Sequence, residues 1–271
     1  SMQEGDFYGT EKSLTVDDEK LVKIIHQDEN GLETILKDDF LLLKGEIIDT
    51  SVMKMNNLES FFKSQIQDAK DKGVLFSLHM KATMMKVSDP IIFGKCVEVF
   101  YKDLFVKYGK DFEGIGVELK NGFGDLFNKL DLLDPKLKES ILSDISSIDK
   151  SNPDLAMVDS DKGITNLHVP SDIIIDASMP AMIRSSGKMW DKKGELQDAK
   201  AVIPDRSYAE IYQETIDFCK ANGAFDPVTM GSVSNVGLMA QKAEEYGSHD
   251  KTFQAINNGT IKVVDSKNQT P

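Results

Sequence analysis

Three side chains of this 271-residue sequence stand where they could carry out chemistry: Lys81, Asp176 and Tyr246. A lysine amine can exchange a proton with a substrate, and a tyrosine phenol can act as a general acid. An aspartate carboxylate is a natural ligand for Mg²⁺ or Mn²⁺, which prefer oxygen donors. Together, these residue types predict a metal-assisted enzyme that moves protons.

Each of the three residues also has an ordinary structural explanation, which the pattern leaves open. The amine of Lys81 could reach solvent or pair with an acid. Asp176 could cap a helix over residues 177–184. Tyr246, directly before Gly247, could cover the end of a helix by packing.

The elements that must position these residues are strands and helices in alternation. Residues 74–78 form an almost continuous apolar run before Lys81, which is typical of a strand buried on both faces. Residues 173–175 are three isoleucines, predicted as a buried strand that ends at Asp176. Because ligands of α/β sheets bind outside the carboxyl ends of strands, both positions favour a functional site.

The rest of the chain completes an α/β pattern. Strands are predicted over residues 21–25, 32–36, 46–49, 155–158, 201–203 and 260–265, the first two joined by a turn at 28–31. Helices are predicted from Asn57 to Gly73, from Ser88 to Tyr108, from Pro135 to about Ile148, over 208–221 and over about 236–246. This order indicates a mixed, partly parallel sheet with flanking helices and a short N-terminal antiparallel element. We expect one domain, in which two lobes are an alternative.

The cysteines and the remaining histidines offer weaker candidates. Cys96 and Cys219 lie far apart in apolar stretches and are predicted as small core residues. His79 and His168 have the apolar surroundings of core histidines, whereas His26 is predicted at the surface. The sequence contains no HExxH motif, glycine-rich phosphate loop or nucleophile elbow.

Charge and hydropathy argue against two kinds of partner. The chain has 45 acidic and 32 basic residues and a net charge of −13, whereas nucleic-acid binding needs a concentrated basic face. No apolar run approaches the ~18 residues of a membrane span. We therefore expect a cytoplasmic protein that acts on a small molecule.

The two ends of the sequence suggest a section of a longer protein. Ser1–Met2 is interpreted as a remnant of expression, and the strand predicted over residues 260–265 has no visible successor. A strand without a visible successor suggests a boundary inside a longer protein.

Five longer strings occur in order between Gly5 and about Phe253. They are Gly-Glu-Ile-Ile-Asp at 45–49, the string from Lys81 to Pro90, Ser-Asp-Lys-Gly-Ile-Thr-Asn-Leu-His-Val-Pro at 160–170, Asp-Ala-Ser-Met-Pro-Ala-Met-Ile-Arg at 176–184, and residues 237–253. These strings resemble the monomeric type of NADP-dependent isocitrate dehydrogenase, a bacterial family. Strings of this length are far more specific than a short motif.

The resemblance implies a fold, a reaction and a role for each residue. It implies the isocitrate/isopropylmalate dehydrogenase-like fold and the conversion of isocitrate to 2-oxoglutarate with NADP and Mg²⁺ or Mn²⁺. Lys81 matches the family's catalytic lysine, Tyr246 its catalytic tyrosine, and Asp176 one of its metal-binding aspartates. Lys81 would assist removal of the substrate's hydroxyl proton, and Tyr246 would protonate the enol left after loss of CO₂.

The resemblance also implies that much of the site lies outside this sequence. The other two metal-binding aspartates and most residues that hold isocitrate and NADP would lie beyond the chain, which would be a fragment of the second, insert-like domain of a monomeric enzyme. We therefore expect the fragment alone to be inactive. The alternatives are a truncated relative that serves as a binding or scaffold protein, and a decarboxylating dehydrogenase for another β-hydroxyacid.

Overall fold

The structure, a computed structural model, describes residues 1–80, 87–170, 175–207, 209–226, 228–229, 252–267 and 269. Its contacts divide the chain into two compact units. Unit 1 consists of Ser1–Gly9 and Met53–Leu238, and unit 2 of Thr10–Val52 and Met239–Pro271. Both units are built from segments that are distant in the sequence.

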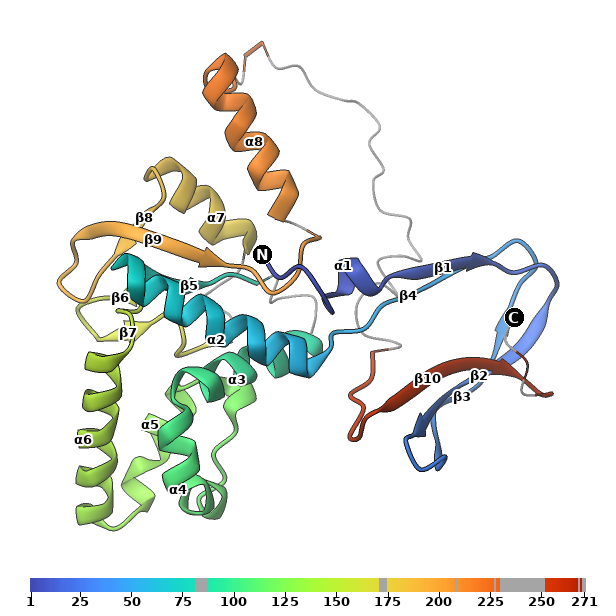
Figure 1. Cartoon of the computed structure of the whole chain (residues 1–271), viewed down its shortest axis with the longest axis horizontal. Coiled ribbons are helices and arrows are strands. Elements are labelled where there is room, and N and C mark those ends of the chain that lie inside the picture. The colour runs from blue at the N-terminus through green and yellow to red at the C-terminus, as the bar shows by residue number, and fades with distance from the viewer. Residues whose placement is uncertain are drawn as a thin grey trace. The chain divides into compact units, whose positions relative to one another are not determined.

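Unit 1 contains most of the helices and a mixed sheet (Figure 1). Its helices are α1 (Phe7–Thr10), α2 (Met55–Lys72), α3 (Ser88–Phe100), α4 (Lys102–Gly114), α5 (Gly124–Lys129), α6 (Pro135–Ser151), α7 (Ile175–Arg184) and α8 (Ala209–Asn222), with short 3₁₀ turns η1 (Leu119–Asn121) and η2 (Leu130–Leu132). Its strands are β5 (Leu75–Leu78), β6 (Met157–Asp159), β7 (Ile164–Thr165), β8 (Lys188–Trp190) and β9 (Leu196–Val202).

Strand β5 is the centre of unit 1. It pairs in parallel with β9, which in turn pairs antiparallel with β8, so the predicted mixed, partly parallel arrangement is confirmed. On its other edge, Phe76 forms a parallel bridge with Leu155. All four residues of β5 are buried, as the apolar run predicts.

Helix α2 shows how the sequence sets the ends of an element. Leu58, Phe62, Ile66 and Ala69 are buried along one face of the helix. Gly73 ends it as predicted, at a φ of 63° that favours glycine, and its N–H bonds back to the last turn. The helix begins at Met55 rather than after Asn57, and its N-cap residue, Lys54, makes no side-chain capping hydrogen bond.

Helix α6 begins as predicted. The Asp134 carboxylate accepts a hydrogen bond from the Lys136 N–H at 2.9 Å, and Pro135 occupies the first helical turn. The helix continues to Ser151, three residues beyond the predicted end.

The prediction of one long helix after Ser88 is wrong, because the chain forms two helices that meet at Tyr101. The backbone of Tyr101 leaves the helical region at φ −106° and ψ 31°. Its ring stacks on Phe123 with ring centres 3.9 Å apart, and its hydroxyl donates to Asp149 at 3.0 Å. These tertiary contacts outweigh the local preference for a continuous helix.

The strand predicted over residues 173–175 also needs correction. Ile175 is the first residue of α7, whereas residues 173 and 174 lie outside the described part of the chain. Met179 and Met182, one helical turn apart, are buried against Ile203. Helical packing thus overrides the strand preference of the β-branched Ile175.

Unit 2 is built from antiparallel strands. These are β1 (Lys12–Thr15), paired with β4 (Ile47–Thr50), and a sheet in the order β10-β2-β3 from β2 (Lys20–Asp28), β3 (Glu33–Leu42) and β10 (Gly259–Asp265). The predicted turn between β2 and β3 is confirmed: the Asp28 carboxylate accepts from the Leu32 N–H at 2.8 Å, and Gly31 has a φ of 84°. The predicted strand over 260–265 finds its partner in β2, with Gly259 opposite Asp28.

Single residues depart from their predicted surroundings. His26 is buried, with 7% of its surface exposed, because β10 and β3 flank it in the sheet. Met2, interpreted above as an expression remnant, is buried in unit 1 and donates its N–H to the Ile203 carbonyl at 3.0 Å. Cys96 is buried as predicted, whereas Cys219 is half-exposed because α8 buries none of its residues.

Among the described helices, none combines the length and apolar character needed to cross a membrane.

Candidate active site

Of the three predicted site residues, the structure describes only Asp176. Lys81 and Tyr246 lie outside the described residues. Asp176 lies in the first turn of α7, where the backbone alone is described, and not at the end of a strand. The chain just before Lys81 is described, however. It forms the carboxyl end of β5 and the two residues that follow it.

Three buried polar side chains gather at this end of β5: Ser77, His79 and Asn166, which we call the β5 cluster. They account for three of the seven buried polar or charged residues in the described part of the chain. The Ser77 hydroxyl oxygen lies 2.8 Å from Nε2 of His79. Because hydroxyls and amides lose favourable hydration when buried, such a cluster requires internal hydrogen bonds.

Asn166 supplies hydrogen bonds that a neighbouring strand would otherwise make. Its side-chain oxygen accepts from the Leu78 N–H at 2.6 Å, and its side-chain nitrogen donates to the Leu78 carbonyl at 3.0 Å. Its own N–H donates to the Ala156 carbonyl at 2.8 Å, and the Ala156 N–H donates to Phe76 at 2.9 Å. The Asn166 side chain thus continues the pairing along this edge of β5.

The opposite edge of β5 is held by β9. The two strands run in parallel register from Leu75 beside Ala199 to Leu78 beside Val202. One residue further on, the His79 N–H donates to the Val202 carbonyl at 2.9 Å. The backbone is therefore fixed on both edges until two residues before Lys81.

The His79 ring is completely enclosed. Burial lowers the pKa of His79 from its ordinary 6.5 to about 4, so the imidazole is neutral at neutral pH. Nε2 faces Ser77, whereas Nδ1 has no hydrogen-bond partner within the part of the chain that the structure describes. The predicted burial of His79 is confirmed, but only one of its two ring nitrogens has a hydrogen-bond partner among the described residues.

The low pKa of His79 should make the chain less stable in mild acid. The unfolded chain binds a proton below pH 6.5, and the folded chain binds it only near pH 4, so stability is lost as pH falls through this window. The loss at pH 4 should reach about 3 kcal/mol relative to His79→Gln. Denaturant unfolding of both proteins between pH 4 and pH 8 measures it. The two curves should run parallel above pH 7, and parallel curves over the whole range would contradict this assignment.

Metal-binding side chains are sparse in the described residues. No group of three or more His, Cys, Asp or Glu side chains there is placed to hold an ion. Asp176 contributes one carboxylate at most, so the described residues do not by themselves fit a Mg²⁺ or Mn²⁺ site.

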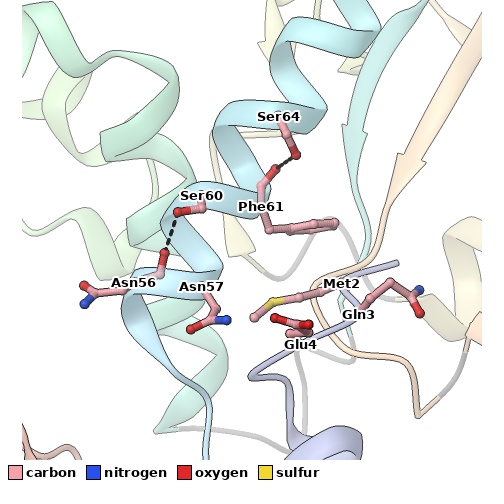
Figure 2. Close-up of a pocket in the computed structure, with 8 residues that line it drawn as sticks. All are labelled: Met2, Gln3, Glu4, Asn56, Asn57, Ser60, Phe61 and Ser64. Carbon is pink, nitrogen blue, oxygen red and sulfur yellow. Dashed lines mark hydrogen bonds between the residues drawn. The ribbon is translucent and has the colours of Figure 1, made fainter.

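A shallow pocket of about 440 Å³ lies beside the start of α2 (Figure 2). Its polar lining comes from the N-terminal segment and from one side of the helix. The Ser60 and Ser64 hydroxyls donate to carbonyl groups of the same helix, at 2.9 and 2.8 Å. Since Glu4 is its one charged lining residue, the pocket does not suit an anionic substrate such as a tricarboxylate.

Sequence reasoning missed Ser77 and Asn166. Ser77 lies on the predicted buried strand and His79 directly follows that strand, two positions after Ser77, so their shared face could have been noticed. Asn166 is 88 residues from Leu78, and no local signal predicts that contact.

Comparisons with known proteins agree with the long strings of resemblance. The chain is 55% identical over 268 residues to isocitrate dehydrogenase [NADP] 2 of Colwellia maris, and 56% identical over 264 residues to isocitrate dehydrogenase [NADP] of Azotobacter vinelandii. The corresponding protein of Mycobacterium tuberculosis, isocitrate dehydrogenase [NADP] 2, is 50% identical over 264 residues. These alignments cover 97–99% of this chain but 35–36% of each relative, so the chain spans about a third of their length.

A family model described as monomeric isocitrate dehydrogenase matches residues 1–270. With nearly every residue inside that match, the chain belongs to the monomeric isocitrate dehydrogenase family.

Proposed function

We propose that this chain is a section of an NADP-dependent isocitrate dehydrogenase, which oxidises isocitrate and decarboxylates the product to 2-oxoglutarate. The observation that carries the proposal is 50–56% identity, over almost the whole chain, to proteins that bear this name. A likeness spread over two compact units is more specific than any single motif.

Lys81 and Tyr246 would carry the two proton transfers. NADP would supply the hydride acceptor, and the amine of Lys81 would take the hydroxyl proton as the substrate carbon is oxidised to a ketone. Loss of CO₂ from the ionised carboxylate of this β-keto acid would leave an enolate, and the phenol of Tyr246 would protonate its carbon to give 2-oxoglutarate. The position of Lys81, three residues beyond a fully buried strand, supports its role.

Asp176 would be one ligand of a Mg²⁺ or Mn²⁺ ion in the longer protein. Such an ion polarises the substrate oxygens when it is bound. Among the described residues, no group of three or more His, Cys, Asp or Glu side chains is placed to hold an ion.

The proposal extends to the fold and the place of the chain in the protein. Strands and helices in this order fit the isocitrate/isopropylmalate dehydrogenase-like fold, and the chain would form part of the second, insert-like domain of a monomeric enzyme. The remaining residues for isocitrate, the metal and NADP would come from the other two-thirds of the protein. The chain by itself would then be inactive.

Formation of NADPH from isocitrate and Mn²⁺ tests the proposal, with the longer protein and this chain assayed side by side. Activity in the longer protein alone is the expected result. Turnover by this chain would contradict its incompleteness. If neither protein formed NADPH from isocitrate, the proposed function would be contradicted. Turnover of another β-hydroxyacid would then indicate a different substrate, and no turnover of any would favour a non-catalytic relative.

A further inference from the structure

Helix α8 (orange in Figure 1) packs against unit 1 along one side only. Ala209 and Tyr212 contact the small cluster that α7 and Ile203 form. Ile216 and Cys219 follow on the same side and are half-buried. None of the 14 residues of α8 is buried, although most helical stability in proteins comes from packing of an apolar face.

A second line of apolar side chains runs along α8 and is exposed. Ile211 and Phe218 are 63% and 49% exposed. Because a helix turns by 100° per residue, these two lie nearly in line, roughly a third of a turn from Tyr212. Beyond the left-handed turn at Gly223, the ring of Phe225 stacks on Phe218 with ring centres 5.0 Å apart. We call Ile211, Phe218 and Phe225 the α8 stripe.

A helix with one apolar side packs against one body, whereas a helix with two apolar sides lies between two. Single exposed apolar residues are common on protein surfaces. Val106 of α4, 76% exposed, is such a residue, because the buried residues of α4 lie on one other side. The α8 stripe differs, since its members are aligned and two of them are in contact.

We propose that the α8 stripe is the docking surface for a segment of the longer protein that lies outside this chain. The inference rests on the proposal that the chain is a section of such a protein. The relatives have the length for it, since the chain covers 35–36% of each of them. Helix α8 then lies between unit 1 and that segment.

The size of the α8 stripe favours a covalently linked segment over a second copy of the chain. A buried aromatic side chain covers about 150–250 Å², so three side chains of which about half is exposed offer roughly 300 Å². Stable complexes of separate proteins bury about 800 Å² on each partner. A tethered segment can be held by a smaller surface, because its linker gives an effective concentration of about a millimolar.

The charge of α8 defines the chemistry of the docking segment. Glu210, Glu214 and Asp217 are exposed and recur at helical spacing beside the α8 stripe. The chain has a net charge of −13, so two copies would repel each other at this surface. The segment should therefore present apolar side chains bordered by lysine or arginine.

Hydrogen–deuterium exchange tests the docking without any substitution. The amides of α8 should exchange about a hundredfold more slowly in the longer protein than in this chain, because docking suppresses local opening of the helix. The amides of α4, which buries three of its own side chains, should differ by less than about threefold. Equal exchange of α8 in the two proteins would overturn the proposal, and so would protection in this chain that is lost on dilution, since that indicates a second copy.

Phe218→Asp localises the effect to the α8 stripe. In the longer protein it should speed exchange of α8 at least about tenfold, because the docked segment would bury a charge. In this chain the same change should stay within about threefold, since the carboxylate meets water. Val106→Asp adds the same charge at an exposed apolar position of α4 and should leave α8 unchanged in both proteins. Equal effects of the two variants on α8 would contradict the proposal.

Glu214→Lys leaves the apolar side chains in place and serves also if Phe218→Asp does not fold. In the longer protein it should speed exchange of α8 at least about threefold at low salt, and less at high salt, because it opposes the basic border of the segment. Unchanged exchange at low salt would overturn the proposed chemistry of the segment.

Exchange and turnover separate this inference from the proposed function. Slow exchange of α8 in a longer protein that forms no NADPH from isocitrate would support the docking surface and contradict the function. NADPH formation by a longer protein in which α8 exchanges as fast as in this chain would do the reverse.

Discussion

Replacing Lys81 by methionine in the longer enzyme should lower kcat for isocitrate by about a thousandfold. The change removes the amine that is proposed to take the hydroxyl proton and keeps an unbranched side chain of similar length. Proton transfer from a positioned group contributes roughly 10² to 10⁴ in rate, so little activity should remain. NADPH formation at saturating isocitrate, NADP and Mn²⁺ measures the loss.

Lys70→Met makes the same chemical change on the exposed side of α2 and is the control for loss of charge. It should leave kcat within about twofold of the wild type, as surface substitutions usually do. If Lys81→Met kept more than about a tenth of the activity, another group would have to take the proton.

Replacing Tyr246 by phenylalanine should slow turnover about a hundredfold or more, at a different step. The ring remains, but the hydroxyl that is proposed to protonate the enolate is lost. Oxidation can still occur, so a single burst of NADPH should precede slow turnover. Lys81→Met should show no such burst, because its defect precedes hydride transfer.

Solvent exchange gives an independent measurement of the same step. The enzyme should exchange a proton next to the ketone of 2-oxoglutarate with deuterium from the solvent, because that exchange reverses protonation of the enol. Tyr246→Phe should lose the exchange, and Tyr8→Phe, at an exposed tyrosine beside Arg206, should keep it. Normal exchange in Tyr246→Phe would assign the proton donor to another residue.

Elements with strong local signals were predictable from the sequence. The apolar run of β5, the glycine that ends α2 and the aspartate that caps α6 each act within a few residues. Their physical causes are burial on both faces, a left-handed backbone and unpaired N–H groups, which the sequence displays directly.

The errors came from contacts between distant residues. Tyr101 interrupts a helical pattern because its partners Phe123 and Asp149 are remote in sequence. Ile175 is a strand former by type, yet it opens a helix whose methionines pack on Ile203. Local propensity cannot include either of these interactions.

The candidate site was predictable only where its residues have local sequence signals. A strand end and long strings of resemblance indicate Lys81, although it and Tyr246 lie outside the described residues. The anchoring of the strand that precedes Lys81 depends on Asn166, whose contact with Leu78 closes over 88 residues. Only a folded structure reveals that contact.

The pairing of β10 with β2 has a consequence for how the protein is made. The strands pair across about 230 residues, and closing a loop of that length costs about 5 kcal/mol of chain entropy. Folding of Met53–Leu238 before β10 emerges from the ribosome shortens the effective loop and lowers that cost. Until then the outer edge of β2 is unpaired, in addition to that of β3, and a second nascent copy can pair with it. Neighbouring nascent chains on one messenger RNA therefore expose a free β2 edge to one another until β10 has been made and pairs with it.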